Sequence, residues 1–100
     1  ATTEIYTLSL HDALPIYPGN KLVCANLGAV YANYGSIAGM SFNLKGAADY
    51  YKKAVPLLET GNNKPALIQV LGNYLKVLKI LNNKAEASKV ESKLQSIMGH

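Results

Sequence analysis

The sequence of 100 residues contains one cysteine, no tryptophan and no arginine. A single cysteine, Cys24, excludes an internal disulfide, and a zinc site would need several further ligands. We expect Cys24 to be a small buried apolar side chain. All ten positively charged residues are lysines. The chain therefore lacks the planar guanidinium group of arginine, which can bind guanine or phosphate through two hydrogen bonds. The net charge of +4 therefore argues only weakly for nucleic acid.

Long apolar runs and catalytic groups are also scarce. No apolar run approaches the roughly 20 residues that span a bilayer. The two histidines, His11 and His100, lie near the two ends, and no pair of carboxylates shares an apolar helix face. Glu86 and Glu91 are interpreted as a helix cap and a solvated partner for lysines. The sequence predicts no catalytic residue, cofactor, metal ligand or small-molecule substrate, and no contact with a membrane.

The first sixteen residues read ATTEIYTLSLHDALPI. Tyr6, Leu8 and Leu10 alternate with polar residues as in a strand, and His11-Asp12 is similar to part of a catalytic pair. Over its whole length, however, this segment resembles the translation of a common short-read sequencing adaptor, so we expect residues 1–16 to contribute nothing to function. Without them, ten lysines face four acidic residues, a net charge of +6. Residues 17–100 are then expected to be the C-terminal end of a longer protein.

Apolar residues at helical spacing form four stripes in the remaining sequence. They run from Val23 to Tyr34, from Leu44 to Leu58, from Leu67 to Leu81 and from Ala87 to Ile97. The predicted order is helix, short loop, helix, twice, with no strand outside residues 1–16.

Glycine and proline set the predicted helix limits. Gly35 is expected to stop the first helix, and Pro56 is expected to end or kink the second, because proline removes a backbone hydrogen bond. Gly28 and Gly72 are interpreted as close-packing positions.

Asparagines mark the later boundaries. Gly61-Asn62-Asn63 is predicted to be a loop, followed by Pro65 in a first helical turn. Asn82-Asn83 should end the third helix, and Asn83 with Glu86 resembles a capping box.

Two hairpins follow from these limits, at about residues 20–60 and 64–98. In the first, Leu27-Gly28 is followed by Tyr31, and Ala47 is followed by Tyr51 and Ala54. In the second, the corresponding positions hold Leu71, Tyr74, Leu75, Leu78 and Ala87. This pattern resembles the tetratricopeptide (TPR) repeat. The stretch from Asn73 to Glu91 is similar to the closing repeat of bacterial TPR proteins of the kinesin light chain type.

The first hairpin departs from the TPR pattern by about seven extra residues between Gly35 and Ala47. Seven residues are close to two helical turns, so helical phase can survive. In the second hairpin, Glu91 stands where an aromatic is expected, and Leu71-Gly72 is an alternative to Tyr74-Leu75 as the Leu-Gly equivalent.

The resemblance implies an all-α fold: two helix-turn-helix hairpins stacked as a short right-handed α-solenoid that acts as a protein–protein interaction scaffold. In such arrays the first helices line a concave groove that holds a partner peptide. The residues expected to face it are Asn26, Asn33, Gln69, Asn73, Lys76 and Lys79. Amides can hydrogen-bond an extended backbone and lysines can bind carboxylates, so the expected partner is a protein or peptide of acidic character.

The resemblance also places Ala47 and Ala87 where paired helices meet. Lys52, Lys53, Lys89 and Lys93, on second helices, are expected to form a solvated outer face.

Other interpretations stay open. The chain can be a generic four-helix bundle in which alanine and tyrosine are ordinary core residues, and any one lysine or asparagine can be merely solvated. It can also be the C-terminal regulatory end of a larger signalling enzyme, such as a bacterial Ser/Thr kinase. A basic helical nucleic-acid binder is the third alternative, which would lose affinity steeply with salt.

Overall fold

The computed structural model describes residues 20–99. They form four α-helices, α2 (Lys21–Met40), α3 (Leu44–Thr60), α4 (Lys64–Ile80) and α5 (Lys84–Ile97), and no strand occurs among residues 20–99. This confirms the prediction of an all-α chain with four helices. Residues 1–16, with the alternating Tyr6, Leu8 and Leu10 and the His11-Asp12 pair, lie outside the described residues.

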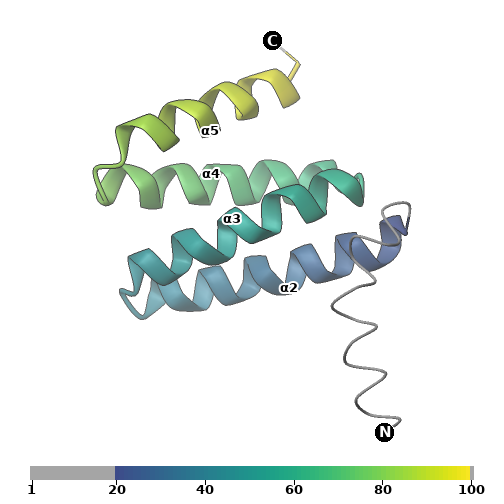
Figure 1. Ribbon diagram of the computed structural model, residues 1–100, viewed down its shortest axis with the longest axis horizontal. Coiled ribbons are helices and arrows are strands. Elements are labelled where there is room, and N and C mark those ends of the chain that lie inside the picture. The colour runs from purple at the N-terminus through teal and green to yellow at the C-terminus, as the bar shows by residue number, and fades with distance from the viewer. Residues whose placement is uncertain (1–19, 100) are drawn as a thin grey trace, which may run out of the picture.

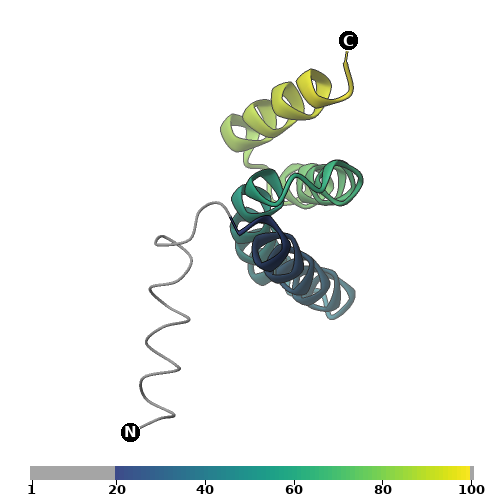
Figure 2. The same ribbon diagram turned by 90° about the vertical axis from the view of Figure 1, so that its right-hand side faces the viewer.

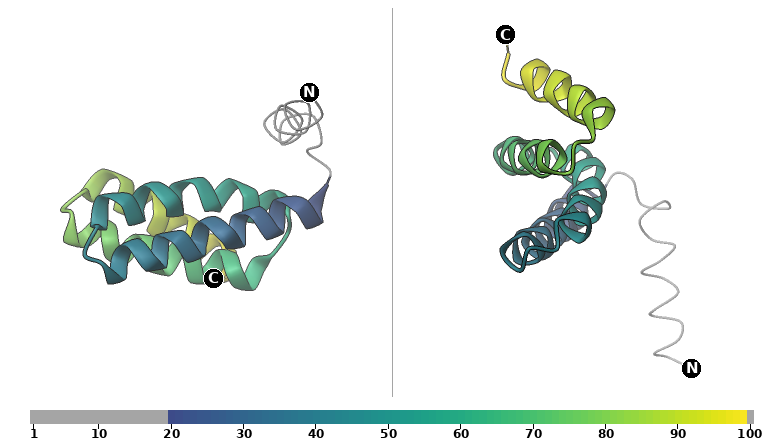
Figure 3. Two further views of the ribbon diagram at one scale, coloured as in Figure 1. Left: turned by 90° about the horizontal axis from the view of Figure 1, so that it is seen from below. Right: turned by 90° about the vertical axis from the view of Figure 1, so that its left-hand side faces the viewer.

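Consecutive helices run in opposite directions, and their order in space follows the chain from α2 at one edge to α5 at the other (Figure 1). Seen end-on, α2 and α4 lie toward one side of the molecule and α3 toward the other (Figures 2 and 3). α5 runs obliquely to α4, so the two helices diverge toward the C-terminal end of α5 (Figure 1).

Each of the four described helices begins at an asparagine. The Oδ1 atoms of Asn20, Asn43, Asn63 and Asn83 each accept a hydrogen bond, at 3.0 to 3.3 Å, from the backbone N–H three residues later. A capping side chain of this kind satisfies a helical N–H that has no partner within the helix. The last three caps recur every 20 residues, which makes one helix plus one turn the repeating unit.

The three connecting turns share one backbone conformation. In the turn after α3, the N–H groups of Asn62 and Asn63 donate to the carbonyls of Glu59 and Leu58, and the turns after α2 and α4 repeat this pattern. The middle residue of each turn has a positive φ: Phe42 at 62°, Asn62 at 56° and Asn82 at 62°. Asparagine tolerates this left-handed region, whereas a phenylalanine there is strained.

The predicted capping box is half correct. Asn83 accepts from the N–H of Glu86, but the Glu86 carboxylate does not return to the Asn83 N–H, which donates to the carbonyl of Leu78. The carboxylate accepts a hydrogen bond from the Tyr74 hydroxyl instead, at 3.1 Å. Glu86 therefore lies in the first turn of α5 and also links α5 to α4.

Two glycines of α2 set its distance from α3. A Cβ atom at Gly28 would lie 2.8 Å from the Leu58 side chain, and one at Gly35 would lie 2.7 Å from the Tyr51 ring. The close-packing interpretation of Gly28 is confirmed, but the prediction that Gly35 stops the helix is wrong, since α2 continues to Met40. Gly35 leaves room for the Tyr51 ring rather than ending the helix. The longer α2 accounts for the extra residues between Gly35 and Ala47 in the first hairpin.

The interpretation of Gly72 as a close-packing position is also wrong. Nothing outside its own turn lies within 4 Å of a Cβ atom placed there, so this glycine is not a close-packing position. The buried positions predicted for Cys24, Ala47 and Ala87 are confirmed.

Pro56 does not end α3, which continues through it to Thr60. The carbonyl that loses its helical partner belongs to Lys52, and both residues are exposed, so water can solvate that carbonyl. Burial of Val55 and Leu58 holds the last turn in place. Tertiary packing therefore outweighs the local preference of proline.

The two helical glycines provide a matched test of packing. We expect Gly35→Ala to lower the free energy of unfolding by about 1–3 kcal/mol, because the new methyl overlaps the Tyr51 ring. Gly72→Ala, in open space, should raise it by about 0.5–1 kcal/mol, because alanine favours the helix. Urea denaturation of both variants measures the difference, and equal effects would contradict the close contact at Gly35.

The strain at Phe42 is testable in the same way. The side chain is almost fully exposed, so Phe42→Asn should remove no contact and should stabilise the chain by about 1 kcal/mol by relieving the positive φ. Phe42→Ala is the control, because alanine shares the strain and should leave the melting temperature nearly unchanged. An asparagine variant that melts below its parent would contradict this account of the turn.

Candidate functional site

Acidic and basic side chains are distributed unequally between the two pairs of helices. The acidic residues of the described chain, Asp49, Glu59, Glu86 and Glu91, all lie on α3 and α5. α2 and α4 carry four lysines and no acid among their residues. All the charged side chains of α2 and α4 are therefore positive.

A small hollow of about 130 Å³ lies between α2 and α4. Asn33 enters it from α2, and Gln69 and Asn73 enter it from α4. Ser36 and Tyr51 also line it, and their hydroxyl oxygens lie 3.2 Å apart, within hydrogen-bond distance. The remaining lining residues are Ala29, Ala32, Ala66 and Val70. We call this site the α2–α4 hollow.

The structure brings three of the six predicted groove residues together. Asn33, Gln69 and Asn73 line the α2–α4 hollow, whereas Asn26, Lys76 and Lys79 do not. All three of the latter are exposed. Asn26 is seven residues before Asn33 and Lys76 is seven after Gln69, which places each pair on one face of its helix. Lys79 follows on the next turn of α4, rotated away from that face.

The hollow is small compared with the sites that enclose small molecules, which measure about 300–1,000 Å³. Its three amide side chains each offer two N–H donors and one carbonyl acceptor. Such groups match the alternating N–H and C=O of an extended backbone. The geometry thus suits a partner that lies across the surface and inserts one small group.

A larger cleft, which sequence reasoning missed, lies between α3 and α5. At its centre, a hollow of about 240 Å³ has Lys52, Lys89 and Lys93 around Val55, Leu71 and Val90. A hollow of about 460 Å³ adjoins it toward the start of both helices and is lined by Lys45, Asp49 and Asn83, among others. The lysines are exposed as expected, but they surround a partly apolar floor to which α3, α4 and α5 each contribute. We call this the α3–α5 cleft.

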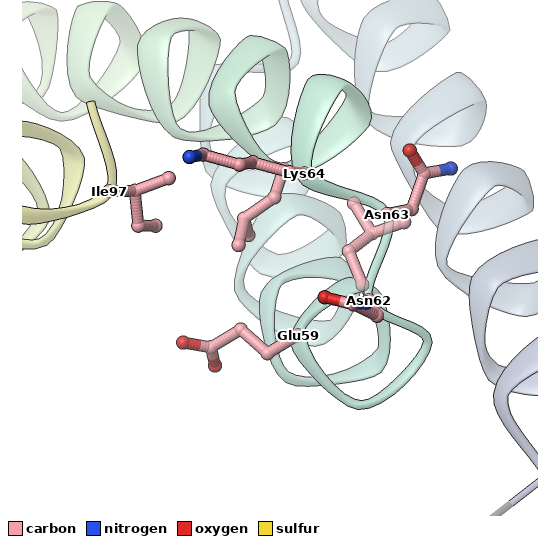
Figure 4. A pocket seen from close by; sticks show the side chains of 7 residues that line it. Glu59, Asn62, Asn63, Lys64 and Ile97 are labelled. Atoms are coloured by element: carbon pink, nitrogen blue, oxygen red, sulfur yellow. The ribbon is translucent and has the colours of Figure 1, made fainter. Parts of the chain in front are cut away.

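The cleft ends near the C-terminus of α5, in a hollow of about 310 Å³ (Figure 4). There the Lys64 side chain extends toward Ile97, above the Glu59 carboxylate in this view (Figure 4). The Lys93 Nζ atom donates to Glu59 at 2.9 Å and so joins α5 to α3 across the cleft. Both side chains are about two-fifths exposed, so this ion pair contributes at most about 1 kcal/mol.

Lys53 differs from the other lysines of α3. Its Nζ atom lies 5.9 Å from the centre of the Tyr31 ring on α2, within cation–π distance. The lysines that were expected to share one solvated face therefore lie in two different places: Lys53 contacts α2, whereas Lys52 faces α5.

One titratable group of the α3–α5 cleft is strongly perturbed. Burial, together with the hydrogen bond to Glu86 and the charge of that carboxylate, raises the pKa of Tyr74 to about 12. The neutral phenol is the donor in this bond, and an ionised phenolate would face the Glu86 carboxylate.

Residues 20–99 contain no group of three or more histidine, cysteine or acidic side chains placed to hold a metal ion. Within the same residues, no helix is both long and apolar enough for a membrane span. No protein-family model, curated protein or solved structure matches the chain.

The raised pKa of Tyr74 predicts a pH dependence of stability. Above pH 10 the phenol ionises in the unfolded chain but keeps its proton in the folded chain, so the free energy of unfolding should fall from pH 10 toward pH 12. Tyr74→Phe should cost about 1 kcal/mol at neutral pH through the lost hydrogen bond and should make that fall shallower. Tyr34→Phe, at a half-exposed ring, is the control and should keep the parent slope. Equal slopes for Tyr74→Phe and its parent would contradict the assignment.

Proposed function

We propose that this chain is a TPR-like protein-interaction scaffold that binds an extended acidic segment of a partner protein across α2 and α4. In this proposal the hairpins α2–α3 and α4–α5 stack as a short right-handed α-solenoid. The observation that carries it is the α2–α4 hollow, which Asn33 lines together with Gln69 and Asn73 although the sequence separates them widely.

Contacts between the hairpins support the stacked arrangement. Tyr51 of the first hairpin lies against Tyr74 of the second, with ring centres 6.4 Å apart, a distance typical of stabilising aromatic pairs. The small residues Gly28 and Ala47 are buried within the first hairpin, and Ala87 is buried in the second. These are the positions where the TPR pattern requires small and aromatic side chains.

The distribution of charge supports an acidic partner. The four lysines of α2 and α4 have no acidic neighbour on their own helices. Lys76 and Lys79 are exposed beside Asn73, so they can bind carboxylates of a segment whose backbone is held by the amides. The described acids lie on α3 and α5, where they would offset part of the attraction of the lysines for an acidic partner.

The test is a binding comparison between two matched pairs of lysines. Short labelled peptides rich in Glu and Asp should bind the full chain with a Kd in the micromolar range or weaker, near −8 kcal/mol at best, because the groove is short. Lys76→Glu with Lys79→Glu should weaken binding by more than about tenfold, as measured by fluorescence anisotropy. Lys52→Glu with Lys89→Glu changes the charge equally at the α3–α5 cleft and should weaken binding far less.

Three outcomes would contradict the proposal. Equal losses in the two double variants would indicate nonspecific attraction, and a larger loss for Lys52 and Lys89 would move the site to the α3–α5 cleft. Tighter binding of duplex DNA than of any peptide, with steep salt dependence, would favour a nucleic-acid binder instead.

A further inference from the structure

The outer edge of α2 carries an exposed row of apolar side chains. Its members, which we call the apolar stripe, recur at intervals of four and three residues: Val23, Leu27, Val30, Tyr34 and Ile37. Val30 is 44% exposed, Tyr34 50% and Ile37 59%, and Leu27 is half-buried. Apart from Tyr34, whose ring centre lies 5.5 Å from that of Tyr50 on α3, this row has no packing partner among the described residues and forms an unpaired apolar surface.

The matching row of α4 is used for packing. Counted from the caps Asn20 and Asn63, the stripe positions 23, 27, 30 and 34 correspond to Ala66, Val70, Asn73 and Val77. Val70 and Val77 are buried, and Ala66, Val70 and Asn73 line the α2–α4 hollow against α2. α4 therefore packs against the preceding hairpin through this face, whereas α2 leaves the corresponding face exposed.

The opposite edge of the molecule does not complement the apolar stripe. The exposed residues of α5 are mostly polar and include Lys84, Ser88, Glu91, Ser92 and Gln95. An apolar stripe would leave these groups without hydrogen-bond partners in a head-to-tail contact. Copies of the chain are thus not expected to stack α2 on α5.

The apolar stripe is instead complementary to itself. α2 carries one charged residue, Lys21, at its first position, so two α2 helices can meet without the repulsion expected from a basic protein. The row is symmetric about Val30: Leu27 and Tyr34 flank it, and Val23 and Ile37 lie seven residues to either side. An isologous contact requires this kind of symmetry, because the same patch serves both copies.

We propose that two copies of this chain form a dimer through the apolar stripe, with their α2 helices antiparallel about a two-fold axis at Val30. Val30 then meets its own copy, Leu27 meets Tyr34, and Val23 meets Ile37. Asn26 and Asn33 lie beside the stripe and supply a polar rim. A single helix about 30 Å long covers less than the roughly 800 Å² per partner of standard interfaces, so the dimer is weak, with a Kd in the micromolar range.

Sedimentation equilibrium of the full chain over a range of concentrations tests the dimer. The expected result is a monomer–dimer equilibrium that Val30→Glu and, separately, Ile37→Glu weaken by at least about tenfold. Leu22→Glu is the matched control, since it places the same charge on an exposed apolar position of the same helix, off the stripe, and should leave the Kd unchanged.

A mixing experiment tests the two-fold axis. Val30→Glu and Val30→Lys chains should each be monomeric alone and should form a mixed dimer together, because opposite charges meet at the axis. A parent chain that stays monomeric up to about 1 mM overturns the proposal. A dimer that Val30→Glu leaves intact also overturns it, and a mixture that fails to associate overturns the antiparallel pairing at Val30. Since no peptide is present, these outcomes are independent of the proposed binding function.

Discussion

The Tyr51 side chain of α3 contacts both of the neighbouring helices, α2 and α4. Its ring fills the space that Gly35 leaves on α2, its hydroxyl lies within hydrogen-bond distance of Ser36, and its ring also packs at a tilt against Tyr74 of α4. Tyr74 in turn donates to Glu86 of α5, so two tyrosines connect all four helices. Because the α2–α4 hollow is lined by Tyr51 and the α3–α5 cleft by Tyr74, both surfaces depend on this pair.

Much of the fold could be predicted from local patterns in the sequence. Apolar residues three and four apart predict the four helices, and Asn83 predicts a helix start because its side chain can cap one without help from the rest of the fold. The errors at Gly35 and Pro56 have one cause. Glycine and proline were interpreted by local preference, whereas Tyr51 requires a glycine opposite it and the buried Leu58 holds the last turn beyond the proline. Such partners cannot be known before the helices are packed.

The candidate site was predictable only in part, for a related reason. Helical spacing places Gln69 and Asn73 near one face of a helix. That Asn33 lines the same hollow depends on how α2 and α4 pack against α3. The α3–α5 cleft was missed because Lys52, Lys89 and Lys93 are also what a solvated face would contain. The 20-residue recurrence of Asn43, Asn63 and Asn83 was a usable signal, since it fixes which positions of successive helices correspond.

The correspondence between α2 and α4, counted from their caps Asn20 and Asn63, links the two proposals. Asn26 and Asn33 correspond to Gln69 and Lys76 of α4, so α2 repeats the polar row of α4 without its charge. On α2 this row borders the apolar stripe on one side and, at Asn33, the α2–α4 hollow on the other. Pairing two copies through the stripe would bring two such rows to one interface and two hollows to its flanks. The surface available to an extended partner would then be about twice that of one chain, which would offset the shortness of a groove built from two hairpins.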